Sequence, residues 1–277
     1  MISSNLSTRN KTSWAVMKSS VYALIIRNLQ QRCTMNPSNK RIFDLSGIFL
    51  EPGVHVLVWT MIRVFRNQEI YNNLSLATFI LLGTIPWLFT YNIFNSCSII
   101  IAENRGLFFF RQIKPLDPVF ALLITELGIM GLVFCSTLLV FSLLGIGWQI
   151  QDPLRWLTAV ALYVLFIAGL GLFIAVSAFF IKYVKKTVKT FMRIKYLFSG
   201  IFFSAQMLPE QYKIYFALNP MFQFITISRE CFSNSALEYN TFGDVFYLFK
   251  CATISMTLGL GMYTVFRNKL MIEIMEH

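Results

Sequence analysis

The 277-residue chain is 56% hydrophobic and 16% aromatic, whereas only 13% of its residues are charged. Charged residues make up about a quarter of an average soluble domain, so this composition excludes that class and indicates an integral membrane protein. The net charge of +11 does not indicate nucleic-acid binding, because the basic residues lie between apolar runs, as the positive-inside rule predicts.

An amphipathic helix is expected over residues 12–33, ahead of the first membrane span. Its apolar side chains share one side of a helical wheel, opposite Arg27 and other polar residues. These apolar side chains are Trp14, Met17, Val21, Leu24, Ile25 and Leu29. Such a helix can lie in the membrane interface or pack on a soluble domain, and we favour the interface.

Two carboxylates fall inside expected membrane spans. Glu51, followed by Pro52, lies in the first span, residues 43–63, and Glu126 lies in the third, residues 119–148. A carboxylate is costly to bury in a membrane, so each is a candidate functional group. His55 shares a helical face with Glu51, which makes an acid/base pair conceivable. We favour a structural carboxylate at the membrane interface.

Three further spans are expected over residues 74–101, 154–181 and 245–266. Each is an apolar run long enough to cross the hydrocarbon core, which takes about 20 residues. Pro86 predicts a kink in the first of them. Gly169 and Gly171 favour close contact between the second and a neighbouring helix.

A short segment between the second and third spans, residues 102–117, combines charged and aromatic residues and is bounded by prolines. On the cytoplasmic side, a rigid knob of this composition can fit a cleft on a soluble partner. The residues expected to make that contact are Glu103, Arg105, Phe108, Phe109, Phe110 and Arg111. The alternative is an ordinary loop packed on the membrane surface.

Residues 199–230 are apolar but interrupted, first by Pro209 and then by Asn219-Pro220. The fifth expected span, residues 190–208, has an apolar part shorter than the roughly 20 residues of a spanning helix. Broken backbone at membrane depth must be covered by protein or face water, because lipid cannot satisfy free N–H and C=O groups. Residues 209–235 are therefore expected to form a re-entrant segment that lines or closes a pathway.

A cationic stretch precedes this region and predicts a cytoplasmic location. Its basic residues are Lys182, Lys185, Lys186, Lys189, Arg193 and Lys195. They could also meet an anionic, lipid-linked substrate at the entrance to a pathway. Most of the 24 Lys and Arg residues fall inside the cell if six spans leave both termini in the cytoplasm. Five spans, with residues 196–232 never crossing, fit the charges equally well.

The order of several residue pairs resembles that of bacterial polysaccharide exporter permeases, the membrane subunits of type-2 ABC transporters, and the capsule exporters most of all. The pairs that carry the resemblance are Glu51-Pro52, Ser199-Gly200, Phe202-Phe203, Leu208-Pro209, Asn219-Pro220 and Arg229-Glu230. Residues 33–41 depart from the family pattern, which leaves the start of the first span open.

The resemblance implies an all-α integral membrane protein with six spans, in which residues 102–117 contact an ATPase. It places a periplasmic gate at Pro209, Asn219, Pro220, Arg229 and Glu230. It implies export of a lipid-linked capsular polysaccharide across the bacterial inner membrane by two copies of this chain and two ABC ATPase subunits, which bind ATP and Mg²⁺. A periplasmic adaptor and an outer-membrane channel could complete the route. Export of an O-antigen or teichoic-acid type glycan, a drug or a lipid stays open.

Aromatic residues are expected to line the path, because the C–H faces of sugars stack on aromatic rings. The expected wall consists of Tyr91, Phe94, Tyr196, Phe198, Phe202 and Phe203. Packing between helices is the alternative for each of these side chains.

Enzyme motifs are absent from the sequence, which has no GxxxxGK[ST] phosphate loop, no HExxH and no nucleophile elbow. The five cysteines are scattered rather than spaced as metal ligands. We therefore expect a transporter with no catalytic residue, metal or cofactor of its own. A membrane-embedded acyltransferase or glycosyltransferase is the remaining alternative, with Glu51, His55 and Glu126 as its candidates.

Overall fold

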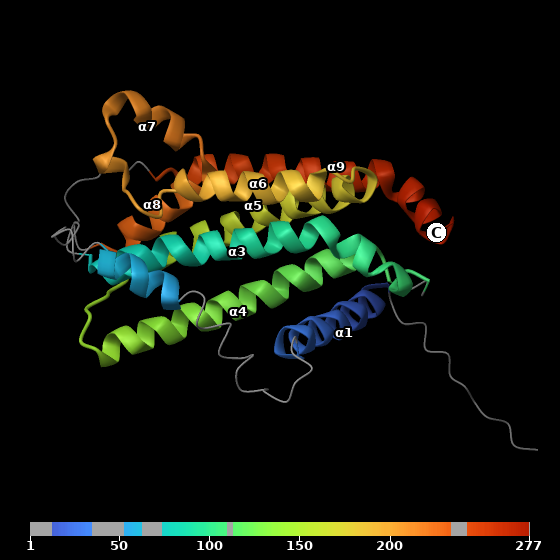
Figure 1. Ribbon diagram of the computed structural model, residues 1–277, viewed down its shortest axis with the longest axis horizontal. Helices are drawn as coiled ribbons and strands as arrows, with labels where there is room; N and C mark the ends of the chain where they lie inside the picture. The colour runs from blue at the N-terminus through green and yellow to red at the C-terminus, as the bar shows by residue number, and fades with distance from the viewer. Residues whose placement is uncertain (1–12, 35–52, 63–73, 110–112, 234–242, 277) are drawn as a thin grey trace, which may run out of the picture.

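Four long apolar helices lie side by side in the computed structural model, which describes residues 13–34, 53–62, 74–109, 113–233 and 243–276 (Figure 1). They are α3 (Leu76–Glu103), α4 (Leu116–Leu143), α5 (Pro153–Phe180) and α9 (Val245–Glu276). Each is long and apolar enough to cross a membrane. The expected all-helical membrane fold is thus present in this coarser form, with four of its spans.

The structure describes one of the two other expected spans only in part, and in the other it shows a helix that ends early. Of residues 43–63, the structure describes only the helix Gly53–Ile62. Of residues 190–208, only the first part is helical, because α6 (Val184–Leu197) ends before the turn at Gly200. Gly200 has a φ of +81°, which glycine adopts without steric cost, and a Cβ there would clash with the Phe222 ring. A 3₁₀ turn, η2 (Ala205–Met207), follows.

Two short helices come next, α7 (Glu210–Ala217) and α8 (Pro220–Phe232). The Asn219 side chain accepts a hydrogen bond from the Met221 N–H, and Pro220 occupies the first turn, where its missing N–H costs nothing. Figure 1 shows α7 projecting from the end of the bundle, whereas α8 lies against it. The α8 side chains Met221 and Ile225 are fully buried.

Helix α1 (Ser13–Thr34) lies beside α4 (Figure 1). Leu24 is buried, whereas Tyr22 and Leu29 are exposed. The Arg27 guanidinium donates a hydrogen bond to the side-chain oxygen of Asn104, the C-cap of α3. These contacts fix α1 to the end of the bundle at which α3 terminates.

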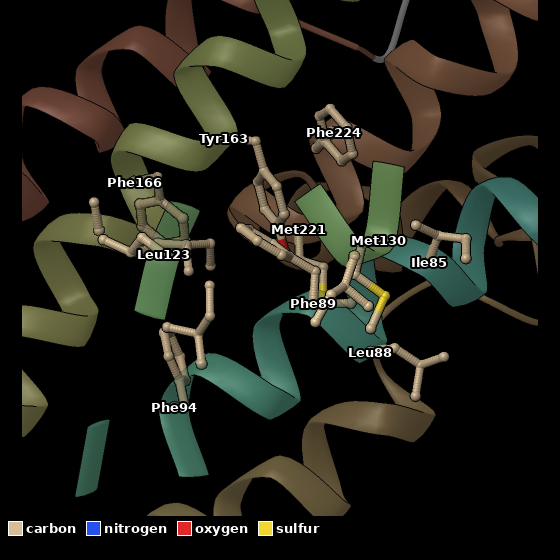
Figure 2. Close-up of a cluster of buried hydrophobic side chains, with 14 of the residues drawn as sticks. Ile85, Leu88, Phe89, Phe94, Leu123, Met130, Tyr163, Phe166, Met221 and Phe224 are labelled. Atoms are coloured by element: carbon tan, nitrogen blue, oxygen red, sulfur yellow. The ribbon is translucent and has the colours of Figure 1, made fainter. Parts of the chain in front are cut away.

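Helices α5 and α9 pack backbone to backbone, as Gly169 predicted. A Cβ on Gly169 would lie 2.5 Å from the backbone nitrogen of Met256, and one on Gly259 would lie 3.0 Å from the Gly169 carbonyl carbon. Across the bundle, the Tyr163 ring of α5 stacks on Phe224 of α8 at 4.4 Å between centroids (Figure 2). The Tyr163 hydroxyl lies 2.6 Å from the Thr90 hydroxyl on α3, so α3, α5 and α8 meet at one buried cluster.

Candidate functional site

Six aromatic side chains gather at the C-terminal end of α6, and we call them the Tyr196 cluster. They come from three parts of the chain: His55 and Trp59, Trp87 and Tyr91, and Tyr196 and Phe202. The Trp87 and Tyr196 centroids are 4.5 Å apart, and those of Trp59 and Phe202 are 4.1 Å apart. All six side chains are partly exposed, so the cluster presents a surface rather than forming a closed core.

Polar groups join this cluster at the Tyr196 hydroxyl. That oxygen accepts a hydrogen bond from Trp59 Nε1 at 3.1 Å and shares another with His55 Nε2 at 2.8 Å. Rings with apolar faces and polar edges are suited to a ligand that is itself apolar on its faces and polar at its rim. A sugar ring has that character.

The structure separates the predicted aromatic wall into three parts. Tyr91, Tyr196 and Phe202 belong to the Tyr196 cluster, whereas Phe198 and Phe203 flank Phe216, at 6.2 and 5.2 Å between centroids. Phe94 is buried in the bundle core (Figure 2).

Sequence reasoning missed Trp59 and Trp87 as members of this cluster, and it missed the contact between His55 and Tyr196. The predicted pairing of His55 with Glu51 stays a prediction, because Glu51 lies outside the described residues. The spacing held a signal, because His55 and Trp59 are four residues apart on one helix, as are Trp87 and Tyr91 on another.

Arg229 binds the broken backbone that follows α6. Its Nη1 donates to the carbonyl oxygens of Gly200 at 2.8 Å and Phe203 at 3.0 Å, and its Nη2 donates to Ile201 at 2.9 Å. Nη2 and Nε also donate to the Phe79 carbonyl at 3.1 and 3.3 Å. The guanidinium carbon lies 3.4 Å from the centroid of the Phe79 ring. One buried side chain therefore satisfies carbonyl groups that lipid could not.

Glu230, next in sequence, ties α8 to α5 and to the start of α9. Its carboxylate accepts a hydrogen bond from Arg155 Nη2 at 2.8 Å and from the Gly243 N–H at 3.3 Å. Arg155 Nη2 also donates to the Gly243 carbonyl at 3.0 Å. Burial raises the pKa of the Glu230 carboxyl, and the Arg155 charge and the Gly243 N–H act against that rise. Of the other predicted gate residues, Pro209 and Asn219 are the N-caps of α7 and α8, which Pro220 begins.

The segment expected to contact an ATPase lies at the end of α3, near the C-terminus of the chain (Figure 1). Glu103 is the last α3 residue and is exposed, and Arg105 begins the 3₁₀ turn η1 (Arg105–Leu107). Phe109 is 69% exposed, whereas the turn places Phe108 in the core at 2%. Phe110 and Arg111 lie outside the described residues.

Of the two candidate carboxylates, the structure describes only Glu126. Glu126 is 1% exposed and accepts a hydrogen bond from Asn92 Nδ2 at 3.2 Å. Glu51 lies outside the described residues. Across the described ranges, no group of three or more His, Cys, Asp or Glu side chains could hold a metal ion.

Helix α6 has an apolar face and a cationic face. Val188 and Met192 are buried on the side that meets α3 and α5. The exposed basic side chains are Lys185, Lys186, Lys189 and Arg193. Helix α6 packs against α3 and α5, so these cations lie beside membrane spans.

Curated relatives cover nearly the whole chain, although no family model matches it. The polysialic acid transport protein KpsM of Escherichia coli is 26% identical across 91% of this chain and 95% of its own length. The capsule polysaccharide export inner-membrane protein CtrC of Neisseria meningitidis serogroup A is 26% identical across 92% and 93%. BexB of Haemophilus influenzae, with the same description, is 24% identical across 85% and 88%. Over most of its length the chain is thus similar to inner-membrane proteins of capsule polysaccharide export.

Proposed function

We propose that this chain is the membrane-spanning subunit of an ATP-driven exporter that moves a lipid-linked capsular polysaccharide across the bacterial inner membrane. Likeness to capsule-export proteins along nine-tenths of the sequence carries the proposal. The partly exposed Tyr196 cluster, set among membrane spans, supports it. The chain lacks a phosphate-binding loop, so ATP and Mg²⁺ bind a separate subunit. Two copies of each subunit form the exporter, with all permease termini in the cytoplasm.

The polymer path runs along α6, from its cationic face to the Tyr196 cluster. Lys185 and Arg193 are eight residues apart, so they differ in depth by about 12 Å. A cation at the centre of a bilayer costs about 2.5–3.5 kcal/mol even on insertion scales, so these side chains face water or the second copy. A cationic wall attracts an acidic polymer, and aromatic rings then contact its sugars through many weak interactions.

Residues 209–235 form the gate at the opposite end of the bundle from Phe109. Arg229 holds residues 200–203 against α3, and Glu230 holds α8 against α5. Helix α7, which projects from the bundle, caps the path (Figure 1). At the other end, Glu103 and Phe109 are exposed and contact the ATPase.

Purification from the native membrane in a mild detergent tests the proposed partner. Mass spectrometry should identify a subunit with a phosphate-binding loop in an equal amount. Phe109→Ala should weaken that association, whereas the Phe246→Ala control, also at an exposed phenylalanine, should not. A chain that supports export when purified without any ATPase would contradict the proposal.

Replacing Trp87 by leucine should reduce surface polysaccharide while the protein still accumulates in the membrane. The indole contacts His55, Tyr91 and Tyr196, and each aromatic pair contributes about 0.5–1.5 kcal/mol. If one such contact also holds the polymer, export should fall roughly three- to tenfold. The measurement is the amount of polymer at the cell surface. The control is Phe246→Leu, a substitution at an exposed position of α9. Unchanged export would remove Trp87 from the path.

Neutralising the cationic face of α6 should slow the export of an acidic polymer. The double substitution Lys189→Gln with Arg193→Gln removes two charges from exposed positions and leaves Val188 and Met192 in place. Lys250→Gln removes an exposed charge from α9 and is the control. Export by the double variant should fall several-fold at low salt and differ less at high salt, because salt screens exposed charges. Equal rates for the double variant and the control would place the cations outside the path.

A further inference from the structure

An apolar pocket of about 130 Å³ lies between α3, α4, α5 and α8, and no residue of the Tyr196 cluster lines it. Ile85, Phe89, Met130 and Phe224 point toward one another there from α3, α4 and α8 (Figure 2). Trp156 lines the pocket from the start of α5. The wall offers almost no hydrogen-bonding surface, so a sugar polymer would lose its contacts with water inside it without replacement.

The pocket opens along α4. Leu127 and Gly131 line it and are both exposed. Neighbouring exposed α4 residues, such as Leu132 and Leu139, are large and apolar. Helix α4 is also one of the four helices long and apolar enough to cross a membrane. A ligand therefore enters from the hydrocarbon of the bilayer.

Ser228 adds one polar group to this wall. Its side chain is 1% exposed and lines the pocket from α8. Its hydroxyl has no hydrogen-bond partner among the described residues. A buried hydroxyl without a partner is unfavourable, so an oxygen atom of a ligand is expected to accept its hydrogen bond.

We infer that this pocket binds one hydrocarbon chain of a membrane amphiphile, with an ester oxygen near the head group accepting a hydrogen bond from Ser228. An apolar cavity of about 150 Å³ stays dry and binds a guest the size of benzene, so this pocket holds a few carbons of a chain and not water. Trp156 lies four residues after Asp152, the N-cap of α5, and tryptophan is common at the membrane interface, where ester groups lie.

A chain bound here contacts α8 beside its two anchoring residues, because Ser228 immediately precedes Arg229 and Glu230. The lipid thus supports the gate from the side of the bilayer. Two amphiphiles can supply such a chain, a glycerolipid of the bilayer or the lipid anchor of an exported polymer.

Fluorescence quenching by bromine atoms on lipid chains tests the site without any transport measurement. The purified full chain is reconstituted in vesicles of phosphatidylcholine with brominated chains, and the Trp156 signal is the difference between the protein and its Trp156→Phe variant. The Gly131→Leu substitution fills the opening of the pocket, and Gly128→Leu is the matched control. Both glycines are exposed on α4 with nothing near their Cβ positions, but only Gly131 lines the pocket.

The Gly131→Leu variant should lose most of the Trp156 quenching, and Gly128→Leu should keep it. Equal quenching in the two variants would overturn the inference. A second experiment adds brominated lysophosphatidylcholine at a low mole fraction to unbrominated vesicles. Strong quenching of Trp156 there would show that the pocket selects a single-chain amphiphile over the bilayer's own glycerolipid, the selection needed to bind a polymer through one chain of its lipid anchor. Quenching only in the first vesicles would assign it to bilayer glycerolipid.

Discussion

Arg229→Met should abolish export and strongly destabilise the protein. The substitution leaves the carbonyl oxygens of Phe79, Gly200, Ile201 and Phe203 without the guanidinium that now donates to them. The Phe79 carbonyl keeps its place in helix α3, but a buried acceptor that loses its donor costs about 1–3 kcal/mol, so the loss at the carbonyls of residues 200–203 is a large part of the 5–15 kcal/mol stability of a typical domain. The midpoint of thermal unfolding in detergent, together with the amount of protein in the membrane, measures the effect.

Arg229→Lys and Arg267→Met make this prediction specific. Lysine keeps the charge, but its ammonium group has only three donors on a flexible stem. It cannot reproduce the planar arrangement of N–H donors in the guanidinium. The unfolding midpoint of the Arg229→Lys variant should lie between that of the Arg229→Met variant and that of the natural protein. Arg267 is exposed on α9, so its loss should change little. An Arg229→Met protein with an unaltered midpoint would show that the carbonyl contacts do not hold residues 200–203.

Gly169→Ala should destabilise the bundle although it adds a single methyl group. That methyl group would meet the backbone of Ser255 and Met256, which cannot rotate away as a side chain can. Helices α5 and α9 would have to separate, and overpacking of this kind costs about 1–3 kcal/mol or more. Thermal unfolding of the purified protein again measures the loss.

The matched control is Gly128→Ala on α4, where nothing lies within 4 Å of the added Cβ. Alanine favours a helix over glycine by up to about 1 kcal/mol, so this variant should be as stable as the natural protein or slightly more so. If both alanine variants unfold at the same temperature, the close approach of α5 and α9 does not limit stability.

Long apolar runs made most of the fold predictable from the sequence. The spans expected at 74–101, 119–148, 154–181 and 245–266 correspond to α3, α4, α5 and α9, because the hydrocarbon thickness sets the length of each run. The end of α6 at Leu197 was not predictable in the same way. Residues 199–208 are as apolar as a span, and only the positive φ of Gly200 and its contact with Phe222 show the turn.

The candidate site was predictable in its composition but not in its grouping. Tyr91 and Phe94 are three residues apart on α3, yet one joins the Tyr196 cluster and the other enters the core. The two side chains differ because different helices cover the two faces of α3. The local sequence around α3 does not show which helix covers which face. The role of Arg229 depends on carbonyl groups 26–150 residues away, which no motif around Arg229 reveals.

Deletion of this gene from its own host, followed by separate measurement of capsular polysaccharide at the cell surface and inside the cell, tests the proposed export most directly. We predict that surface polysaccharide disappears while polymer accumulates in the cytoplasm, and that expression of the intact chain restores the surface polymer. Loss of polymer from both compartments would indicate a role in synthesis, and an unchanged surface polymer would contradict an exporter.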